Sequence, residues 1–173
     1  MIEIDTNFWI NRVIVRRGYN TNTISWKEAF YNLNDSISKN ESVKGAVGHT
    51  RRYVDGKNIE DAIRKNAGFF VSYNAERISL VPDVLNDLKC LVAHLYIGID
   101  VTNPGFDNHV DPDDVWFWQN KGISRWDFNN GDSYTLNEGD LIYVPKGVYH
   151  KVSTVEARFG ISMSLKKDKK QNG

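Results

Sequence analysis

Cysteine is almost absent from the chain. Of the 173 residues only Cys90 is a cysteine, which excludes an intramolecular disulfide and any cysteine-rich zinc site. Such a chain has no need of an oxidising compartment, so we expect a cytoplasmic protein.

The chain also lacks an excess of charge and a long apolar run. Lys plus Arg number 22 and Asp plus Glu number 22, so the basic excess typical of proteins that bind nucleic acid or membrane surfaces is missing. No run approaches the roughly 20 apolar residues that span a bilayer, and the acidic start of the chain is unlike a secretory signal. Neither nucleic acid nor a membrane is expected as a partner.

Aromatic residues, by contrast, are plentiful. They make up 12% of the chain, which favours strands and aromatic pocket walls. The length fits a single domain with a substantial core, expected over residues 1–165. Within it we expect an N-terminal part of helices and strands (1–90) and a barrel core (91–165), followed by a charged flexible tail (166–173).

Helical and strand patterns alternate in the first 90 residues. Ser25 with Glu28 three residues later, ahead of helically spaced apolar residues, is a capping-box pattern, and Pro82 fits the first turn of a second helix. The elements predicted here are a strand within 8–19, a helix at 25–37, a short helix at 58–66, a strand at 68–74 and a helix at 81–92.

From residue 91 onward, short apolar segments alternate with turns rich in Gly, Asn and Asp, a pattern typical of a sandwich or small barrel. Strands are predicted at 91–99, 114–119, 123–128, 140–145, 150–154 and 157–165. In the second of these, Trp116 and Trp118 share a face, and we expect them to fill the core beside the candidate site.

That site begins with His109 and Asp111, which stand one residue apart in the stretch GFDNHVDPDDVWFWQ. Alternate side chains of a strand share a face, so both can point into one cavity. An imidazole and a carboxylate, joined by a second imidazole, form the facial triad that leaves three positions open on Fe(II). His150 is the candidate for the second imidazole. The two aspartates that follow, Asp113 and Asp114, are better explained as turn residues.

A turn motif precedes His150. Gly139, Pro145, Gly147 and His150 resemble the second cupin motif, in which a Gly is followed by five residues, Pro-x-Gly, two residues and His. Gly139 permits a tight turn and Pro145 with Gly147 reverses the chain, so the next strand presents His150 to the barrel interior. The first cupin motif is matched less well, because Asp111 stands where a second His is usual and no Glu follows.

Three segments resemble Jumonji-C-type oxygenases, especially the bacterial branch that acts on ribosomal proteins. They are FWINRVIVRRGY (8–19), HVDPDDVWFWQNKGISRW (109–126) and LNEGDLIYVPKGVYHKV (136–152). The resemblance implies a mainly β fold, a double-stranded β-helix (cupin or jelly-roll barrel) with a few flanking N-terminal helices. It also implies a minimal Fe(II)- and 2-oxoglutarate-dependent hydroxylase in which His109, Asp111 and His150 hold the metal. Members of the family often dimerise, which makes a homodimer a candidate state.

By the same resemblance, the co-substrate 2-oxoglutarate needs a cation for its distal carboxylate. In the family the strand after the Gly turn usually supplies Lys or Arg, but Ser124 occupies the matching position here. Arg158 is similar in placement to the co-substrate Arg of other 2-oxoglutarate oxygenases, and a guanidinium can grip a carboxylate through two parallel hydrogen bonds. The further candidates for this pocket are Lys121, Arg125, Ser124, Ser162 and Tyr96.

Two other functions stay open. One is a cupin metalloenzyme without 2-oxoglutarate, such as an isomerase, lyase or dioxygenase of a small organic acid, and Ser124 favours it because a hydroxyl cannot form a salt bridge. The other is a non-catalytic metal- or ligand-binding cupin. For an oxygenase, the prime substrate is either a protein side chain or a small molecule.

Overall fold

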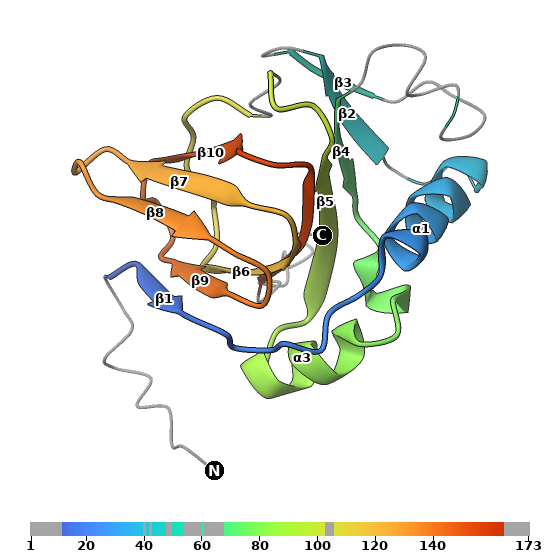
Figure 1. The fold of residues 1–173 in the computed structure, drawn as a ribbon, viewed down its shortest axis with the longest axis horizontal. Helices are drawn as coiled ribbons and strands as arrows, with labels where there is room; N and C mark the ends of the chain where they lie inside the picture. Colours follow the sequence, from blue (N-terminus) through green and yellow to red (C-terminus); the bar gives the residue numbers. More distant parts are fainter. Residues whose placement is uncertain are drawn as a thin grey trace, which may run out of the picture.

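Two antiparallel β-sheets form the framework of the protein (Figure 1). The computed structural model describes residues 12–39, 41, 43–47, 50–53, 60, 68–102 and 106–164. The larger sheet has eight strands in the order β1-β9-β6-β11-β5-β4-β2-β3, and the smaller has three in the order β10-β7-β8.

The strands are short, as their turn-rich sequence predicts. In chain order they are β1 (Ile14–Arg16), β2 (Val43–Val47), β3 (Thr50–Tyr53), β4 (Phe69–Ser72), β5 (Val92–Gly98), β6 (Val115–Lys121), β7 (Ser124–Phe128), β8 (Ser133–Leu136), β9 (Leu141–Val144), β10 (His150–Thr154) and β11 (Arg158–Ser164). Strands far apart in sequence are neighbours, since β11 lies between β6 and β5. The predicted mainly β jelly-roll architecture is confirmed.

All six strands predicted after residue 90 are present, and the structure adds β8, which the sequence did not predict. Its residues, SYTL, place only Tyr134 and Leu136 on the inner face, and two apolar positions in four residues are too short a pattern to predict a strand. β2 and β3 were also not predicted. The predicted helix at 58–66 and the tail at 166–173 lie outside the described residues, apart from Glu60.

Within the described residues, the helical elements with defined bounds are α1 (Trp26–Ser38), the 3-10 turn η1 (Ala75–Arg77) and α3 (Val81–Leu88). The capping box of α1 is confirmed, because the Glu28 amide donates to Ser25 Oγ at 3.2 Å and the Ser25 amide donates to Glu28 Oε2 at 3.1 Å. α3 ends earlier than predicted, since Lys89 turns into the left-handed region (φ 54°) just ahead of β5. No helix within the described ranges is long and apolar enough to cross a membrane.

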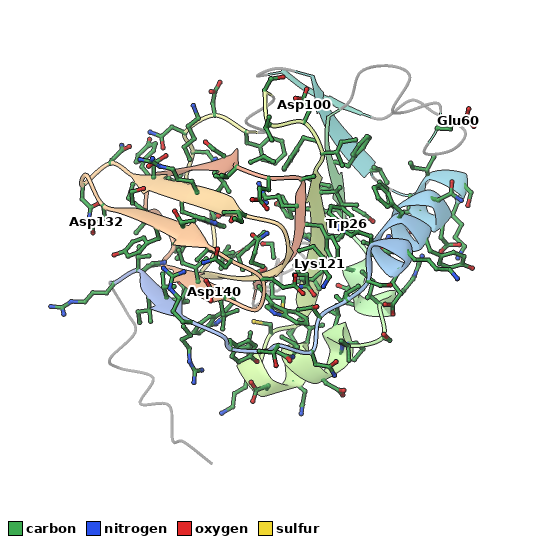
Figure 2. The ribbon with its side chains drawn as sticks, viewed as in Figure 1. Trp26, Glu60, Asp100, Lys121, Asp132 and Asp140 are labelled. Atoms are coloured by element: carbon green, nitrogen blue, oxygen red, sulfur yellow. The ribbon has the colours of Figure 1, made fainter. Side chains whose placement is uncertain are left out.

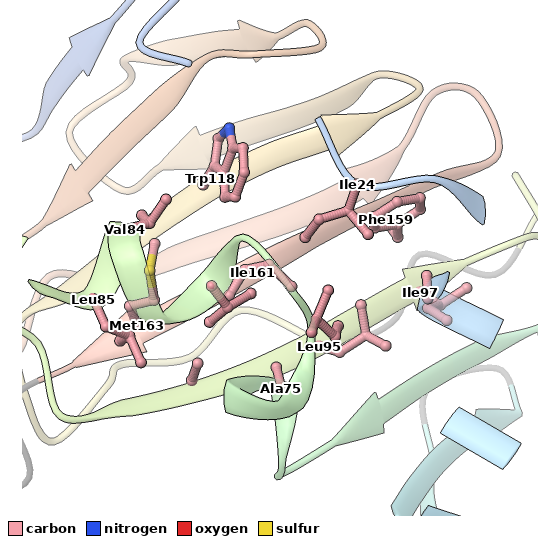
Figure 3. Close-up of a cluster of buried hydrophobic side chains, with 14 of the residues drawn as sticks. Ile24, Ala75, Val84, Leu85, Leu95, Ile97, Trp118, Phe159, Ile161 and Met163 are labelled. Atoms are coloured by element: carbon pink, nitrogen blue, oxygen red, sulfur yellow. The ribbon is translucent and has the colours of Figure 1, made fainter. Parts of the chain in front are cut away.

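The apolar core has two layers, one on each face of the larger sheet. Figure 3 shows the outer layer, where Leu95, Trp118 and Ile161 from three neighbouring strands pack with Val84 of α3. The inner layer lies between the sheets and includes Phe117, Trp126, Phe128, Leu136 and Ile142. The expectation that Trp116 and Trp118 fill the core beside the site is wrong, because Trp118 is in the outer layer and Trp116 packs against it. Phe117, between them, faces inward.

Candidate metal centre and its pocket

The structure brings His109, Asp111 and His150 together. One ligand atom from each lies within 4.8 Å of the others. The histidines are paired through the backbone, because the His109 amide donates to the His150 carbonyl at 3.0 Å and the His150 amide donates back at 2.9 Å. Directly opposed residues of such a pair point to the same side, and the two ring centroids are 4.5 Å apart.

The segment that carries His109 and Asp111 is not a strand, contrary to the prediction. The pairing of His109 with His150 is an isolated bridge within an otherwise irregular segment. A second backbone bond holds the segment, since the Gly147 amide donates to the Asp111 carbonyl at 3.2 Å. The turn that contains Gly147 therefore leads into His150 and also holds the segment of His109 and Asp111 through this hydrogen bond. Asp114 has the predicted turn role, because its Oδ1 accepts the Lys146 amide at 2.8 Å.

Each histidine presents the same nitrogen to the site. His109 Nδ1 lies 2.7 Å from the Asp107 carbonyl, and His150 Nδ1 lies 3.0 Å from the Val148 carbonyl. Because a carbonyl oxygen only accepts, Nδ1 carries the proton in both rings and the lone pair of Nε2 is left for a metal. His150 Nε2 is 3.6 Å from Asp111 Oδ2. Burial lowers the pKa of His150, which favours the neutral ring that a metal requires.

Aromatic rings fix the plane of His150. Trp126 stacks on it at 5.5 Å between centroids and 20° between planes, and Phe128 contacts it at 6.1 Å. On the other side of the triad, Phe106 meets His109 edge-on at 6.1 Å. Both imidazoles are thus held by packing as well as by hydrogen bonds, which preorganises the ligand set.

The triad lies in a pocket that also contains a buried cation. Its walls include Phe69, Tyr96 and Phe117, together with Ser162 and Arg158. Arg158, at the start of β11, is 1% exposed, yet its Nε and Nη1 have no hydrogen-bond partner within the described part of the chain.

The guanidinium of Arg158 lies over two aromatic rings, 5.9 Å from the centroid of Phe69 and 6.0 Å from that of Phe117. Burial lowers the pKa of Arg158 to about 10, so the group still carries its charge at neutral pH. Buried charges are normally paired. An unpaired buried guanidinium that lines a pocket is therefore suited to bind an anionic ligand.

No family model matches the chain, and no curated protein matches it. Solved structures do. The fold is similar to that of a ribosomal oxygenase. An Escherichia coli YcfD structure, described as a ribosomal oxygenase in complex with cobalt and 2-oxoglutarate, aligns over 92% of this chain with a TM-score of 0.70 at 15% identity. Another, with cobalt and succinic acid, aligns over 92% with a TM-score of 0.69 at 16% identity.

A third YcfD structure covers 96% of this chain with a TM-score of 0.72 at 14% identity. The alignments span 49% to 54% of YcfD, so this chain has the extent of about half of that protein. The expected resemblance to bacterial ribosomal oxygenases is confirmed at the level of the fold.

Ser124 stands at the position where the sequence resemblance leads one to expect a cation, and its side chain makes hydrogen bonds to other residues instead. Ser124 is buried, donates to Gln119 Oε1 at 2.7 Å and accepts the indole N–H of Trp126 at 3.1 Å. Within the described residues it does not line the pocket that holds the triad. Its contacts support Trp126, and through that ring they support His150.

The remaining predicted residues divide into two groups. Tyr96 and Ser162 line the pocket with Arg158. Lys121 (labelled in Figure 2) and Arg125 do not. Lys121 Nζ donates to Thr23 Oγ1 at 2.8 Å and pairs with Glu138, while Arg125 is largely exposed and pairs with Asp127 at 2.9 Å.

Sequence reasoning missed the aromatic residues of the pocket wall other than Tyr96, among them Phe69 and Phe106. They contact each other edge-on at 5.2 Å and both line the pocket. Nothing in their local sequence signals this role, because Phe69 belongs to a strand that is buried at all four positions. Only the pairing of β4 with β5 brings Phe69 to the pocket.

Proposed function

We propose that the protein is an Fe(II)- and 2-oxoglutarate-dependent oxygenase of the Jumonji-C type, which hydroxylates a C–H bond of its prime substrate. One observation carries the proposal: the pocket holds a His, Asp and His ligand set together with a buried guanidinium whose Nε and Nη1 lack a partner among the described residues. The first suits a divalent metal and the second suits the far end of a dicarboxylate.

The donor set fits the metal. Two imidazole Nε2 atoms and one carboxylate are the ligands of the facial triad, which suits Fe(II) and leaves positions open for a chelating co-substrate. The Nδ1 bonds to Asp107 and Val148 hold the lone pairs of His109 and His150 toward Asp111. Outer contacts of this kind orient metal ligands and raise their basicity.

The pocket also fits the co-substrate. 2-Oxoglutarate carries a 2-oxo acid at one end, which chelates a metal, and a carboxylate at the other, which needs a cation. Arg158 would pair with that carboxylate, and this assignment explains why its Nε and Nη1 are otherwise unpartnered. Tyr96 and Ser162, on the same pocket wall, are further candidates for contacts to the co-substrate.

The chemistry itself belongs to the cofactor: bound iron and 2-oxoglutarate supply oxidation by O2, with release of CO2 and succinate. The chain supplies geometry and exclusion of water. The rings of Phe69, Phe106, Phe117 and Trp126 make the pocket wall largely apolar, which limits the entry of solvent beside the reacting atoms.

The prime substrate is a protein side chain or a small molecule. The likeness to YcfD supports the type of reaction, and because it spans about half of that protein, it does not extend to the ribosomal substrate in its name. A cytoplasmic location accords with the single cysteine, Cys90, which is buried and free.

The test is an anaerobic titration with Fe(II) followed by 2-oxoglutarate. We expect a weak visible charge-transfer band when both are present, and release of succinate once O2 is admitted. Asp111→Ala should abolish the band, with Asp113→Ala as the matched control, since Asp113 is a partly exposed bend residue that does not belong to the triad. Bound metal without the band or succinate would favour a cupin that works without 2-oxoglutarate.

A further inference from the structure

Three of the four unpartnered buried side-chain atoms in the described residues belong to just two side chains. They are Arg158 Nε, Arg158 Nη1 and Thr154 Oγ1, and the fourth is Trp118 Nε1 in the outer core layer. Buried polar groups are rarely left without a partner, because each one costs free energy. Thr154 is 5% exposed and has no part in the function proposed so far.

The Thr154 hydroxyl lies over Gly98, the residue directly opposite Arg158 in the sheet. Arg158 and Gly98 are directly opposed on β11 and β5, so their side-chain positions lie on the same face, about 5 Å apart. A Cβ added to Gly98 would lie 2.5 Å from Thr154 Oγ1. The hydroxyl therefore occupies the space of the missing side chain, next to Arg158.

Phe69 gives independent support for this placement. Its ring lies 3.5 Å from the same Gly98 Cβ position, and the Arg158 guanidinium lies over that ring at 5.9 Å. Thr154 and Arg158 thus converge on one aromatic neighbour from two directions. Thr154 belongs to β10 of the smaller sheet and Arg158 to β11 of the larger.

We propose that Thr154 and Arg158 together form the carboxylate-binding end of the pocket, each sheet supplying one donor. This inference rests on the proposed function. A carboxylate has two oxygens and about four lone-pair sites, so it can accept from a guanidinium and a hydroxyl at once. Thr154 does not itself line the pocket, whereas Arg158 and Phe69 do. The proposal therefore requires the carboxylate to enter between Arg158 and Phe69 to meet the Thr154 hydroxyl.

Among the described residues that line the pocket, no carboxylate outside the metal triad competes for this position. Asp111 is the sole acidic side chain among the described residues that line the pocket, and it belongs to the metal triad. The ligand class that satisfies both donors is a 2-oxo acid with a second carboxylate at its far end.

The experiment measures binding of two ligands to the Mn(II)-loaded full chain by calorimetry. 2-Oxoglutarate has the distal carboxylate, and 2-oxopentanoate has the same five-carbon chain without it. In Thr154→Val the affinity for 2-oxoglutarate should fall on the order of tenfold, the value of a hydrogen bond to a charged group. The affinities for 2-oxopentanoate and for Mn(II) should not change. Thr154→Ser, which retains the hydroxyl, should bind 2-oxoglutarate like the wild type.

The outcomes separate this inference from the proposed function. Wild-type protein that binds no 2-oxoglutarate would overturn both. Wild-type protein that binds it, with Thr154→Val unchanged or weakened equally for both ligands, would overturn the role of Thr154 alone. Gly98→Ala is the second variant, and its methyl group should displace the hydroxyl and reproduce the selective loss without removing Thr154.

Discussion

Replacing Arg158 with methionine should make the ligand-free protein more stable. Burial lowers the pKa of Arg158 from 12.5 to about 10, and at about 1.36 kcal/mol per pKa unit this corresponds to about 3 kcal/mol against the charged form. The ring contacts with Phe69 and Phe117 offset about 0.5–1 kcal/mol each. Methionine retains an unbranched apolar stem, so we expect the free energy of unfolding to rise by about 1–2 kcal/mol.

The assay is urea denaturation of the metal-free protein at pH 7, repeated with Mn(II) and 2-oxoglutarate. Ligand at a hundred times its Kd should stabilise the wild type by about 2.7 kcal/mol and the variant far less. Arg125→Met is the matched control, because Arg125 is largely exposed, and its effect should stay within about 0.5 kcal/mol. If Arg158→Met instead lost more than about 1 kcal/mol without ligand, Arg158 would be a structural residue and the reasoning would be refuted.

Three further predictions concern the metal and the turns around it. Asp111→Ala should abolish tight Mn(II) binding, measured by calorimetry, and tight binding in that variant would contradict the assigned ligand set. Gly122→Ala should lower the free energy of unfolding by about 3 kcal/mol or more in thermal unfolding, because its methyl would lie 2.0 Å from the Ala157 carbonyl oxygen at φ +67°. Gly147→Ala, where φ is +78° and the space is open, should lower it by only about 1–2 kcal/mol. Equal losses of stability in the two variants would argue against the clash at Gly122. Burial acts to raise the pKa of Asp140 (Figure 2), but hydrogen bonds from backbone amides and an arginine outweigh burial and lower the pKa. The ionised Asp140 therefore stabilises the fold at neutral pH, and this stabilisation is lost as the pH falls below the usual Asp range. The difference in urea midpoint between wild type and Asp140→Asn should accordingly shrink from pH 7 to pH 3, and a constant difference would contradict this.

The residues of the candidate metal centre could be predicted from the sequence because they stand in or next to local motifs. Gly139, Pro145 and Gly147 set the turn ahead of His150, and the turn chemistry of such residues is readable from the chain alone. The way His109 reaches His150 was not readable, since it depends on one isolated bridge between segments that are about 40 residues apart. Strand alternation predicted correctly that His109 and Asp111 lie together, although their segment is not a regular strand.

The inner and outer faces of β6 could not be told apart from its sequence. Five of its seven residues are buried, and each face carries large apolar side chains. Periodicity alone therefore does not say which face meets the pocket. Phe117 faces inward, and Trp118, expected there, faces the helices. The choice depends on pairing with β11 and β9, which is a property of the whole sheet.

The sequence also could not show which of the candidate cations lies in the pocket. Lys121, Arg125 and Arg158 are equivalent as charges in the sequence, and their placement differs because of their partners. Lys121 and Arg125 pair with the acidic residues Glu138 and Asp127. Arg158 instead lies over two aromatic rings, and its Nε and Nη1 have no hydrogen-bond partner among the described residues. Burial without a counter-ion distinguishes Arg158, and burial is a tertiary property.

The Nδ1 bonds of the two histidines run to carbonyls only two residues earlier in the chain. Each ring is therefore aimed by the same short piece of backbone that carries it, whether or not an ion has arrived. Binding of a divalent ion should therefore need little change in the rotamers of His109 and His150. Replacement of one such ion by another should not require the two β-sheets to separate. The rate of metal exchange would then be limited by passage of the ion between the aromatic side chains that line the pocket.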